Sequence, residues 1–117
     1  MRAFLTAFVL MTAIAISSAH AVGLEFGHEL KQALDSSEIF DKTHQPALGY
    51  LAGVFDGYVL GVAYATNGNV WCPPPNTTNG QLKAVVAKYL KANPATWNES
   101  ALVLVFIALK QNFPCKK

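Results

Sequence analysis

The sequence predicts a small all-α domain, a four-helix or four-to-five-helix bundle closed by one disulfide. Apolar residues recur at helical spacing in several segments, and no segment shows the strict alternation of a half-buried strand. Clusters of Asn, Gly and Pro separate these segments. The chain has two cysteines, Cys72 and Cys115, so one intramolecular pairing is possible.

The first residues have the pattern of a secretory signal peptide. Arg2 gives a positive start, residues 3–16 are apolar, and Ala19-His20-Ala21 matches a cleavage site. We therefore expect residues 1–21 to be removed and residues 22–117 to form a single exported helical domain. The alternative is a retained anchor, but the apolar run is short for a membrane span, and we expect none in the mature form.

Export would place both cysteines in an oxidising compartment, which favours a disulfide between Cys72 and Cys115. Closing the intervening loop stabilises a fold by roughly 4 kcal/mol in the chain-entropy description. The alternative is a redox-active pair, which usually has closely spaced cysteines.

The first predicted helix runs from residue 24 to about residue 36. Glu25 and Glu29 lie near its first turn, where the helix dipole favours negative charge. We expect Asp35-Ser36-Ser37 to end it. Its predicted apolar face consists of Phe26, Leu30, Ala33 and Leu34.

The second predicted helix runs from Pro46, a residue suited to a first turn, to about Thr66. Its glycines are spaced by four, and glycine inside a helix costs up to about 1 kcal/mol relative to alanine. We therefore expect another backbone to approach closely, within the domain or across a homodimer. The same spacing occurs in membrane helix dimers, but Asp56 argues against a span. The stripe consists of Gly49, Gly53, Gly57 and Gly61.

A loop rich in proline follows, inside a stretch from Gly57 to Leu82 that has no charged side chain. Because prolines restrict the backbone, the loop between Val70 and Asn79 is a candidate for binding a partner with little loss of entropy. Trp71 is its candidate aromatic anchor; the alternative is that this ring packs over the disulfide. The candidate partner-binding residues are Trp71, Pro74, Pro75, Asn76, Thr77 and Asn79.

Two more helices complete the prediction. Thr78 and Gln81 fit a capping box at the start of the third, which ends at Asn93-Pro94 and carries lysines on a face expected to be solvated. The fourth begins near Asn98 and continues through apolar residues 101–109. A helix that is apolar all round is expected at the buried centre of the bundle.

No catalytic set emerges from the chain, so we do not expect an enzyme, and we expect neither cofactor nor metal. Glu25, His28 and Glu29 share one helical turn, but such a trio is more often a solvated face than a metal site. For Asp56 we prefer a structural or exposed role to that of a general acid. Without Arg2, eight basic side chains remain against seven acidic ones, a net charge of +1, which does not favour nucleic acid as a partner.

The segment from about residue 50 to residue 115 resembles the Rap/Tai-type immunity proteins associated with bacterial type VI secretion. The resemblance implies a small helical periplasmic protein, often a homodimer, that binds a cell-wall-degrading effector and occludes its cleft. In one branch that effector is a peptidoglycan amidase. The residues that carry the resemblance are Gly57 to Ala63, Cys72, Pro74, Pro75, Thr78, Gly80 to Leu82, Val85, Val86, Tyr89, Leu90, Pro94, Ala101, Ala108, Leu109 and Phe113 to Cys115.

The alternative function is that of a periplasmic acid-stress chaperone of the small two-cysteine helical kind. Such a protein needs a large change of charge at low pH. Seven carboxylates and the histidines His28 and His44 supply only a modest change, so the toxin-binding function is preferred.

Overall fold

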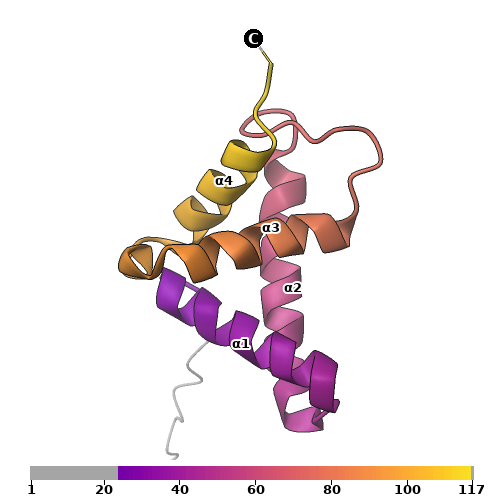
Figure 1. Cartoon of the computed structure of the whole chain (residues 1–117), viewed down its shortest axis with the longest axis vertical. Helices are drawn as coiled ribbons and strands as arrows, with labels where there is room; N and C mark the ends of the chain where they lie inside the picture. Colours follow the sequence, from indigo (N-terminus) through magenta and orange to yellow (C-terminus); the bar gives the residue numbers. More distant parts are fainter. Residues whose placement is uncertain (1–23, 117) are drawn as a thin grey trace, which may run out of the picture.

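The computed structural model describes residues 24–116, which confirm the all-α prediction and the disulfide between Cys72 and Cys115 (Figure 1). The predicted signal peptide lies outside these residues. No β-strand is present between residues 24 and 116; two isolated β-bridges occur there. The helices are α1 (Gly27–Thr43), α2 (Pro46–Thr66), α3 (Asn79–Ala92), the short 3-10 helix η1 (Pro94–Thr96) and α4 (Ala101–Asn112).

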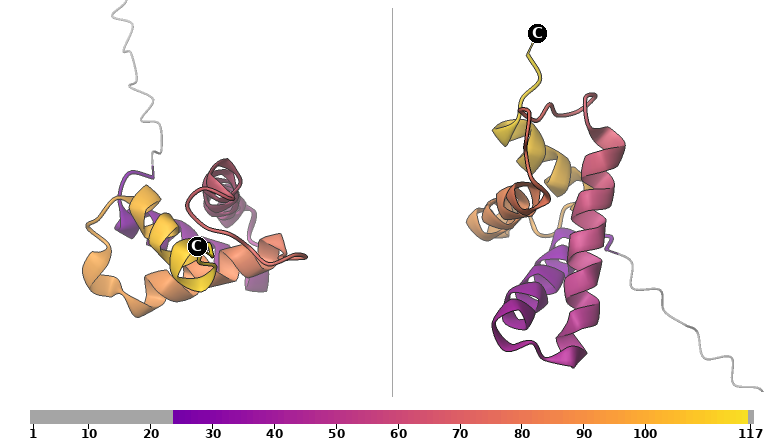
Figure 2. Two further views of the ribbon diagram at one scale, coloured as in Figure 1. Left: turned by 90° about the horizontal axis from the view of Figure 1, so that it is seen from above. Right: turned by 90° about the vertical axis from the view of Figure 1, so that its right-hand side faces the viewer.

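Helix α2 runs along the whole length of the described domain, as Figures 1 and 2 show. Helix α1 packs along the first part of α2, α4 lies beside its last part, and α3 crosses between them. The core lies where the four helices meet. Its largest fully buried side chains are Trp71, Leu30, Leu90, Leu104, Leu109, Val59, Val86 and Val105.

Helix α1 is longer than predicted, because the expected break at Asp35-Ser36-Ser37 does not occur. The helix continues through both serines, which are buried with 8% of their surface exposed. Ser36 Oγ donates a hydrogen bond to the carbonyl oxygen of Gln32, 3.0 Å away, so its hydroxyl is satisfied inside the helix. The helix ends where His44 adopts a left-handed conformation and its N–H donates to the Phe40 carbonyl.

The start of α4 also differs from the prediction, because Asn98 is not its cap. The helix begins at Ala101, and the side chain of Ser100 makes no capping hydrogen bond. Instead the N–H of Ala101 donates to the carbonyl oxygen of Glu25 at 2.9 Å, while the N–H of Gly27 donates to the carbonyl oxygen of Glu99 at 2.8 Å. The start of α4 is therefore completed by backbone from the other end of the described chain.

We call this contact, between residues 25–30 and residues 97–101, the N-terminal joint. Gly27 fits there because a Cβ atom at this position would lie 2.3 Å from Leu104 Cδ1 and 2.9 Å from Trp97 Cα. Glu29 Oε2 accepts hydrogen bonds from the N–H groups of Glu25, at 2.7 Å, and Phe26, at 3.0 Å. These two bonds hold the pKa of Glu29 below its ordinary value of 4.5.

Local capping signals correctly located α2 and α3. Helix α2 begins at Pro46 and ends at Thr66, as predicted. At the start of α3, Thr78 Oγ1 accepts from the N–H of Gln81 at 3.2 Å, and Gln81 Oε1 accepts from the N–H of Thr78 at 2.8 Å. The predicted capping box is thus confirmed, as is the end of α3 before Asn93-Pro94.

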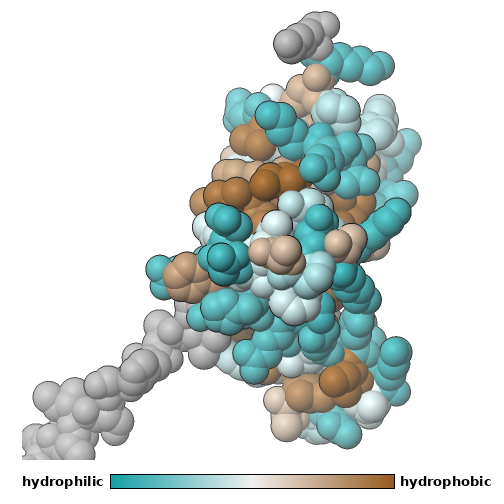
Figure 3. All heavy atoms as spheres, turned by 60° about the vertical axis from the view of Figure 1, so that its left-hand side comes forward, coloured by the Kyte–Doolittle hydropathy of each residue, from teal (hydrophilic) through white to brown (hydrophobic). Residues whose placement is uncertain are grey.

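Helix α4 is buried on one side only, so the prediction of a central helix surrounded by protein is wrong. Ala101, Leu104 and Val105 face the core, whereas Leu102 and Val103 are 42% and 43% exposed. Figure 3 shows hydrophobic side chains reaching the surface among hydrophilic ones. With four helices, α4 has neighbours on one side, and the outer side chains meet solvent.

The lysines of α3 were predicted to form a solvated face, but two of them join helices. Lys83 Nζ lies 2.9 Å from Asp56 Oδ2 on α2, and Lys91 forms an ion pair with Glu38 on α1. Asp56 therefore has the structural role expected for it. Both pairs are partly exposed, and such pairs contribute little to stability.

Candidate protein-binding surface

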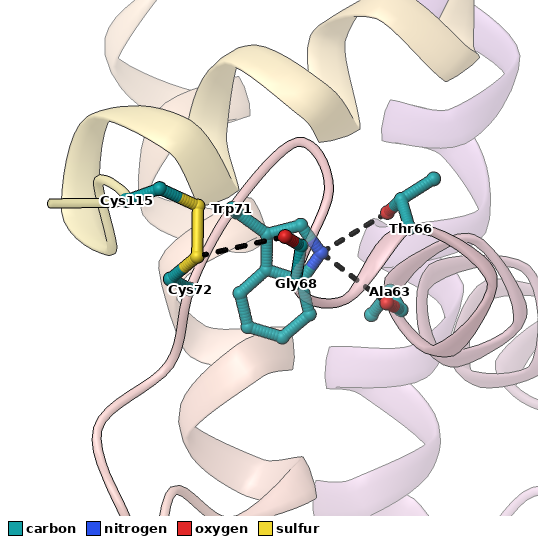
Figure 4. Close-up of a disulfide and its surroundings, with 6 residues drawn as sticks. All are labelled: Ala63, Thr66, Gly68, Trp71, Cys72 and Cys115. Carbon is teal, nitrogen blue, oxygen red and sulfur yellow. Dashed lines mark hydrogen bonds between the residues drawn. A yellow bond between two sulfur atoms is a disulfide. The ribbon is translucent and has the colours of Figure 1, made fainter. Parts of the chain in front are cut away.

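The uncharged loop between α2 and α3 begins with a tight turn after Thr66. Gly68 has a φ of +82°, a conformation that favours glycine, and its N–H donates to the carbonyl oxygen of Trp71 at 2.8 Å. The turn directs the chain back towards the core. This reversal brings Trp71 under the end of α4, as Figure 4 shows.

Trp71 cannot serve as an exposed aromatic anchor, because its side chain is only 2% exposed. Its indole Nε1–H donates to the Ala63 carbonyl oxygen at 3.2 Å and to Thr66 Oγ1 at 3.0 Å (Figure 4). Its ring packs against Phe113, with centroids 5.9 Å apart. In this fold the ring is therefore not available to a partner, and its burial against Phe113 favours the alternative of a packing role. A buried tryptophan with a satisfied N–H instead fixes the base of the loop.

The disulfide holds the next residue of the loop. Cys72 is bonded to Cys115 beyond the end of α4, and the Cys72 N–H donates to the Phe113 carbonyl oxygen at 2.8 Å. The bond and the hydrogen bond therefore attach the same point of the loop to the same end of α4. Both cysteines are used in this bond, so neither is a free thiol.

The tip of the loop is a β-turn from Pro74 to Thr77. The Thr77 N–H and Oγ1 both donate to the Pro74 carbonyl oxygen, at 3.3 and 2.7 Å. Asn76 has a φ of +66°, and Pro75 precedes it, which is the pattern of a type II turn. Because Pro75 and Asn76 are exposed, the turn presents a proline ring and an amide on a constrained backbone.

The far end of the loop is also fixed. Tyr64 Oη on α2 donates to Asn79 Oδ1 at the start of α3, next to the capping box of Thr78. Of the candidate residues, Pro74, Pro75, Asn76 and Asn79 are therefore exposed on one restrained segment, and Thr77 is half-buried in the turn. Their contact with a partner stays a prediction.

The chemistry of this surface suits binding. The loop offers proline rings, amides and hydroxyls, and no charged group between Gly57 and Leu82. Between residues 24 and 116, no three His, Cys, Asp or Glu side chains lie close enough to hold a metal ion. On either side of Pro74 and Pro75 the surface is hollowed, by about 590 Å³ towards the disulfide and about 380 Å³ towards α3.

The glycine stripe of α2 was predicted to pack closely, and within this chain only Gly49 does so. A Cβ atom at Gly49 would lie 3.3 Å from the Phe40 ring, whereas at Gly53, Gly57 and Gly61 it would meet nothing within 4 Å. Close packing of these three inside the domain is therefore wrong. They lie opposite the buried side of α2, which consists of Ala52, Phe55, Val59 and Ala63.

Two tyrosines lie on the same side of α2 as these glycines. Tyr50 is 66% exposed and Tyr64 is 62% exposed. We call the surface formed by Tyr50, Gly53, Gly57, Gly61 and Tyr64 the outer face of α2. Of the helices described, α2 is also the one long and apolar enough to cross a membrane, a property shared by core helices of soluble proteins. In this structure Asp56 on α2 forms an ion pair with Lys83 of α3.

The sequence profile of the Rap1a immunity proteins matches residues 27–115, which include all four α-helices and both cysteines. The chain belongs to this family. A comparison with curated proteins found no match. The resemblance inferred from the second half of the chain is therefore confirmed and extends to α1.

Membership indicates an immunity protein against a toxin, and proteins of this family are typically not enzymes. It favours this function over that of an acid-stress chaperone. The family also agrees with the site, because the restrained loop offers uncharged groups suited to contact with a protein.

Proposed function

We propose that this immunity protein is exported to the periplasm, loses residues 1–21, and neutralises a type VI secretion effector that degrades the cell wall. The effector would be a hydrolase of the peptidoglycan amidase type, inhibited by steric occlusion of its cleft. The family match supports the toxin-binding function, and the pattern around Ala19-His20-Ala21 supports export.

The observation that carries this proposal is the restraint of the loop between Trp71 and Asn79. A buried indole, a disulfide, a type II turn and a capping box fix it at successive points. A segment fixed before binding loses little conformational entropy when it enters a cleft. The exposed Pro75-Asn76 pair replaces Trp71 as the part of the loop that contacts the toxin.

The experiment combines this protein with the hydrolase encoded beside its gene and measures peptidoglycan hydrolysis. We expect complete inhibition at one protomer of this protein per molecule of hydrolase. Asn76→Gly keeps the positive φ of the turn but removes the amide, and should raise the dissociation constant by about fivefold or more if this residue contributes as a hot spot. Asn69→Gly makes the same change in an exposed loop residue outside the turn and should have no effect.

The result that contradicts the proposal is a neighbouring hydrolase that this protein neither binds nor inhibits. If the hydrolase binds but Asn76→Gly retains full affinity, as the control Asn69→Gly does, the toxin contacts another surface. Only the assignment of the turn is then wrong.

A second experiment tests the restraint itself. In the double variant Cys72→Ala and Cys115→Ala, we expect the packing of Trp71 on Phe113 and the hydrogen bond from the N–H of residue 72 to the Phe113 carbonyl to remain, because neither needs the sulfur atoms. We expect a loss of roughly 2 to 4 kcal/mol in unfolding free energy. At temperatures where circular dichroism shows the helices intact, toxin affinity should already be reduced. Affinity equal to that of the parent under those conditions would show that the bond does not preorganise the loop.

We also propose that the protein is a homodimer through the outer face of α2. This face is symmetric in sequence about Gly57, with Gly53 and Gly61 four residues away and Tyr50 and Tyr64 seven residues away. An antiparallel crossing of two copies at Gly57 would place Tyr50 of one copy near Tyr64 of the other. A two-fold interface requires such self-complementarity, and glycines allow the two backbones to approach.

The alternative use of this apolar helix, insertion into a membrane, would require separating Asp56 from Lys83 and exposing the core side of α2. The dimer keeps both intact. Sedimentation without detergent distinguishes the dimer from membrane insertion. The dimer predicts twice the monomer mass in solution, and finding the protein only in the membrane fraction would contradict it.

A further inference from the structure

Three hollows adjoin one another in a row, each sharing lining residues with the next. The first, of about 590 Å³, lies over the disulfide; the second, of about 380 Å³, lies between the turn and α3. Pro74, Pro75 and Phe113 line both. The third, of about 590 Å³, lies between α3 and the end of α1, and Ala84 lines it together with the second. We call this row of three hollows the α3 groove.

Few charged side chains line the α3 groove, and their balance is positive. They are Lys116 in the first hollow, and Glu38, Lys88 and Lys91 in the third. Glu38 and Lys91 neutralise each other in an ion pair. Lys88 and Lys116 form no ion pair with any residue between 24 and 116. The groove therefore has a positive charge towards each end.

Between these charges the lining is apolar or uncharged. Proline rings and Phe113 form the part shared by the first two hollows, and Ala84 and Val85 continue it along α3. From Gln81 to Lys91 the helix rises by about 15 Å at 1.5 Å per residue. An extended peptide rises by about 3.3 Å per residue, so this part of the groove has room for four or five residues.

We propose that the α3 groove binds an extended segment of the toxin in which acidic residues flank apolar or aromatic ones. The acidic side chains pair with Lys116 and Lys88, and the apolar side chains enter the hollows beside Pro74 and Ala84. The identity of the partner as a toxin rests on the proposed function; the chemistry of the segment rests on the charges and lining of the groove.

The same observations argue against a nucleic acid in this groove. Two unpaired lysines provide a small share of the phosphate contacts on which such binding depends. Charge complementarity with a protein segment needs only a few charges, and it affects the rate and selectivity of association more than the affinity.

The experiment follows amide shifts of the 15N-labelled protein during titration with short acetylated peptides. The first probe, Asp-Phe-Gly-Leu-Gly-Phe-Gly-Asp, is longer than the α3 part alone so that it can also reach the first hollow and Lys116. The second probe replaces both aspartates by lysine, and the third replaces Phe and Leu by serine. We expect the first to shift Gln81, Ala84, Lys88 and Lys116, and the other two to bind more weakly. Equal binding of the acidic and basic probes, or shifts confined to other residues, would overturn the proposal.

Two sets of variants test the charges and the hollows separately. Lys88→Gln and Lys116→Gln should each weaken the first probe about two- to fivefold, as expected for partly exposed pairs. Lys42→Gln and Lys110→Gln remove the same charge outside the groove and should change nothing. Ala84→Gln fills the point where two hollows meet and should reduce binding, whereas the smaller Ala84→Ser should not.

The two proposals fail in different ways. If the toxin binds with an affinity that the two lysine variants and Ala84→Gln leave unchanged, the groove assignment is wrong while the immunity function stands. If the acidic probe binds the groove but no cell-wall hydrolase binds the protein, the proposed effector is wrong while the groove stands. Selective binding of an RNA oligonucleotide over the acidic probe would also overturn the assignment.

Discussion

The N-terminal joint and the outer face of α2 use glycine for opposite purposes. At the joint, Gly27 is buried against Leu104 and the backbone of Trp97, which leave no room for a side chain. On the outer face, Gly57 has open space around it and gains nothing from the rest of the described chain. Glycine at the joint therefore serves the fold of one chain, whereas glycine on α2 destabilises a single chain and becomes useful only if a second backbone approaches.

Of these two regions, the joint is expected to show the larger effect. Gly27→Ala places a Cβ atom 2.3 Å from Leu104 Cδ1 and 2.9 Å from Trp97 Cα, and the backbone atom cannot move without disturbing the start of α4. We expect a loss of about 1 to 3 kcal/mol in unfolding free energy, although alanine is the better helix former. Urea unfolding measures this change. An unchanged midpoint would mean that the joint is loosely packed.

The matching change on the outer face should have the opposite sign. Gly57→Ala is expected to raise the stability of the separate protomer by about 0.5 to 1 kcal/mol, because alanine favours the helix and meets no neighbour. The same variant should weaken the dimer, since a methyl group keeps the second helix further away.

Analytical ultracentrifugation over a range of concentrations, combined with thermal unfolding of the dilute protein, separates these two effects. Gly68→Ala is unsuitable as a control because its φ of +82° would introduce strain. Gln111→Ala, at an exposed position of α4 away from the outer face of α2, is the control and should leave the dimer unchanged. If Gly57→Ala also leaves the dimer dissociation constant unchanged, the outer face is not the dimer interface.

The smallest effect is expected from pH at the joint. Glu29 has a lowered pKa in the folded protein because it accepts from the N–H groups of Phe26 and Glu25. Its contribution to stability is complete above the pKa of the unfolded chain and is lost as the pH falls through the lower folded pKa. In Glu29→Gln this acid dependence should be smaller. Urea midpoints measured from pH 6 down to pH 2 test this, and parallel curves for the two proteins would contradict it.

Sequence reasoning located the elements whose signals are local. Pro46 and the pair Thr78 and Gln81 act on neighbouring backbone, so α2 and α3 were found with their correct starts. It failed where distant residues decide. Ser36 stays helical because its hydroxyl finds a carbonyl one turn earlier and its surroundings are buried, and α4 starts at Ala101 because Glu25 supplies the acceptor.

The candidate site shows the same division. The restraint of the loop was predictable from its prolines and from Cys72. The burial of Trp71 was not, because it depends on the position of Phe113 at the end of α4. The α3 groove also had no signal in the sequence, since Lys116 and Lys88 line different hollows that only the fold connects through a third. The spacing of the α2 glycines was visible, but their direction away from the core was not.

The contact between the Glu25 carbonyl and the Ala101 N–H has a consequence for mutational tolerance. Every amino acid has a backbone carbonyl, so position 25 can change its side chain and still supply the acceptor. Ser100 caps α4 without a side-chain hydrogen bond and Asn98 is not its cap, so we expect positions 98 and 100 to tolerate substitution as well. Selection on this part of the molecule should therefore concentrate on position 27, where the requirement is the absence of a side chain. Saturation mutagenesis of these four positions would show three permissive sites around one where every residue other than glycine lowers stability.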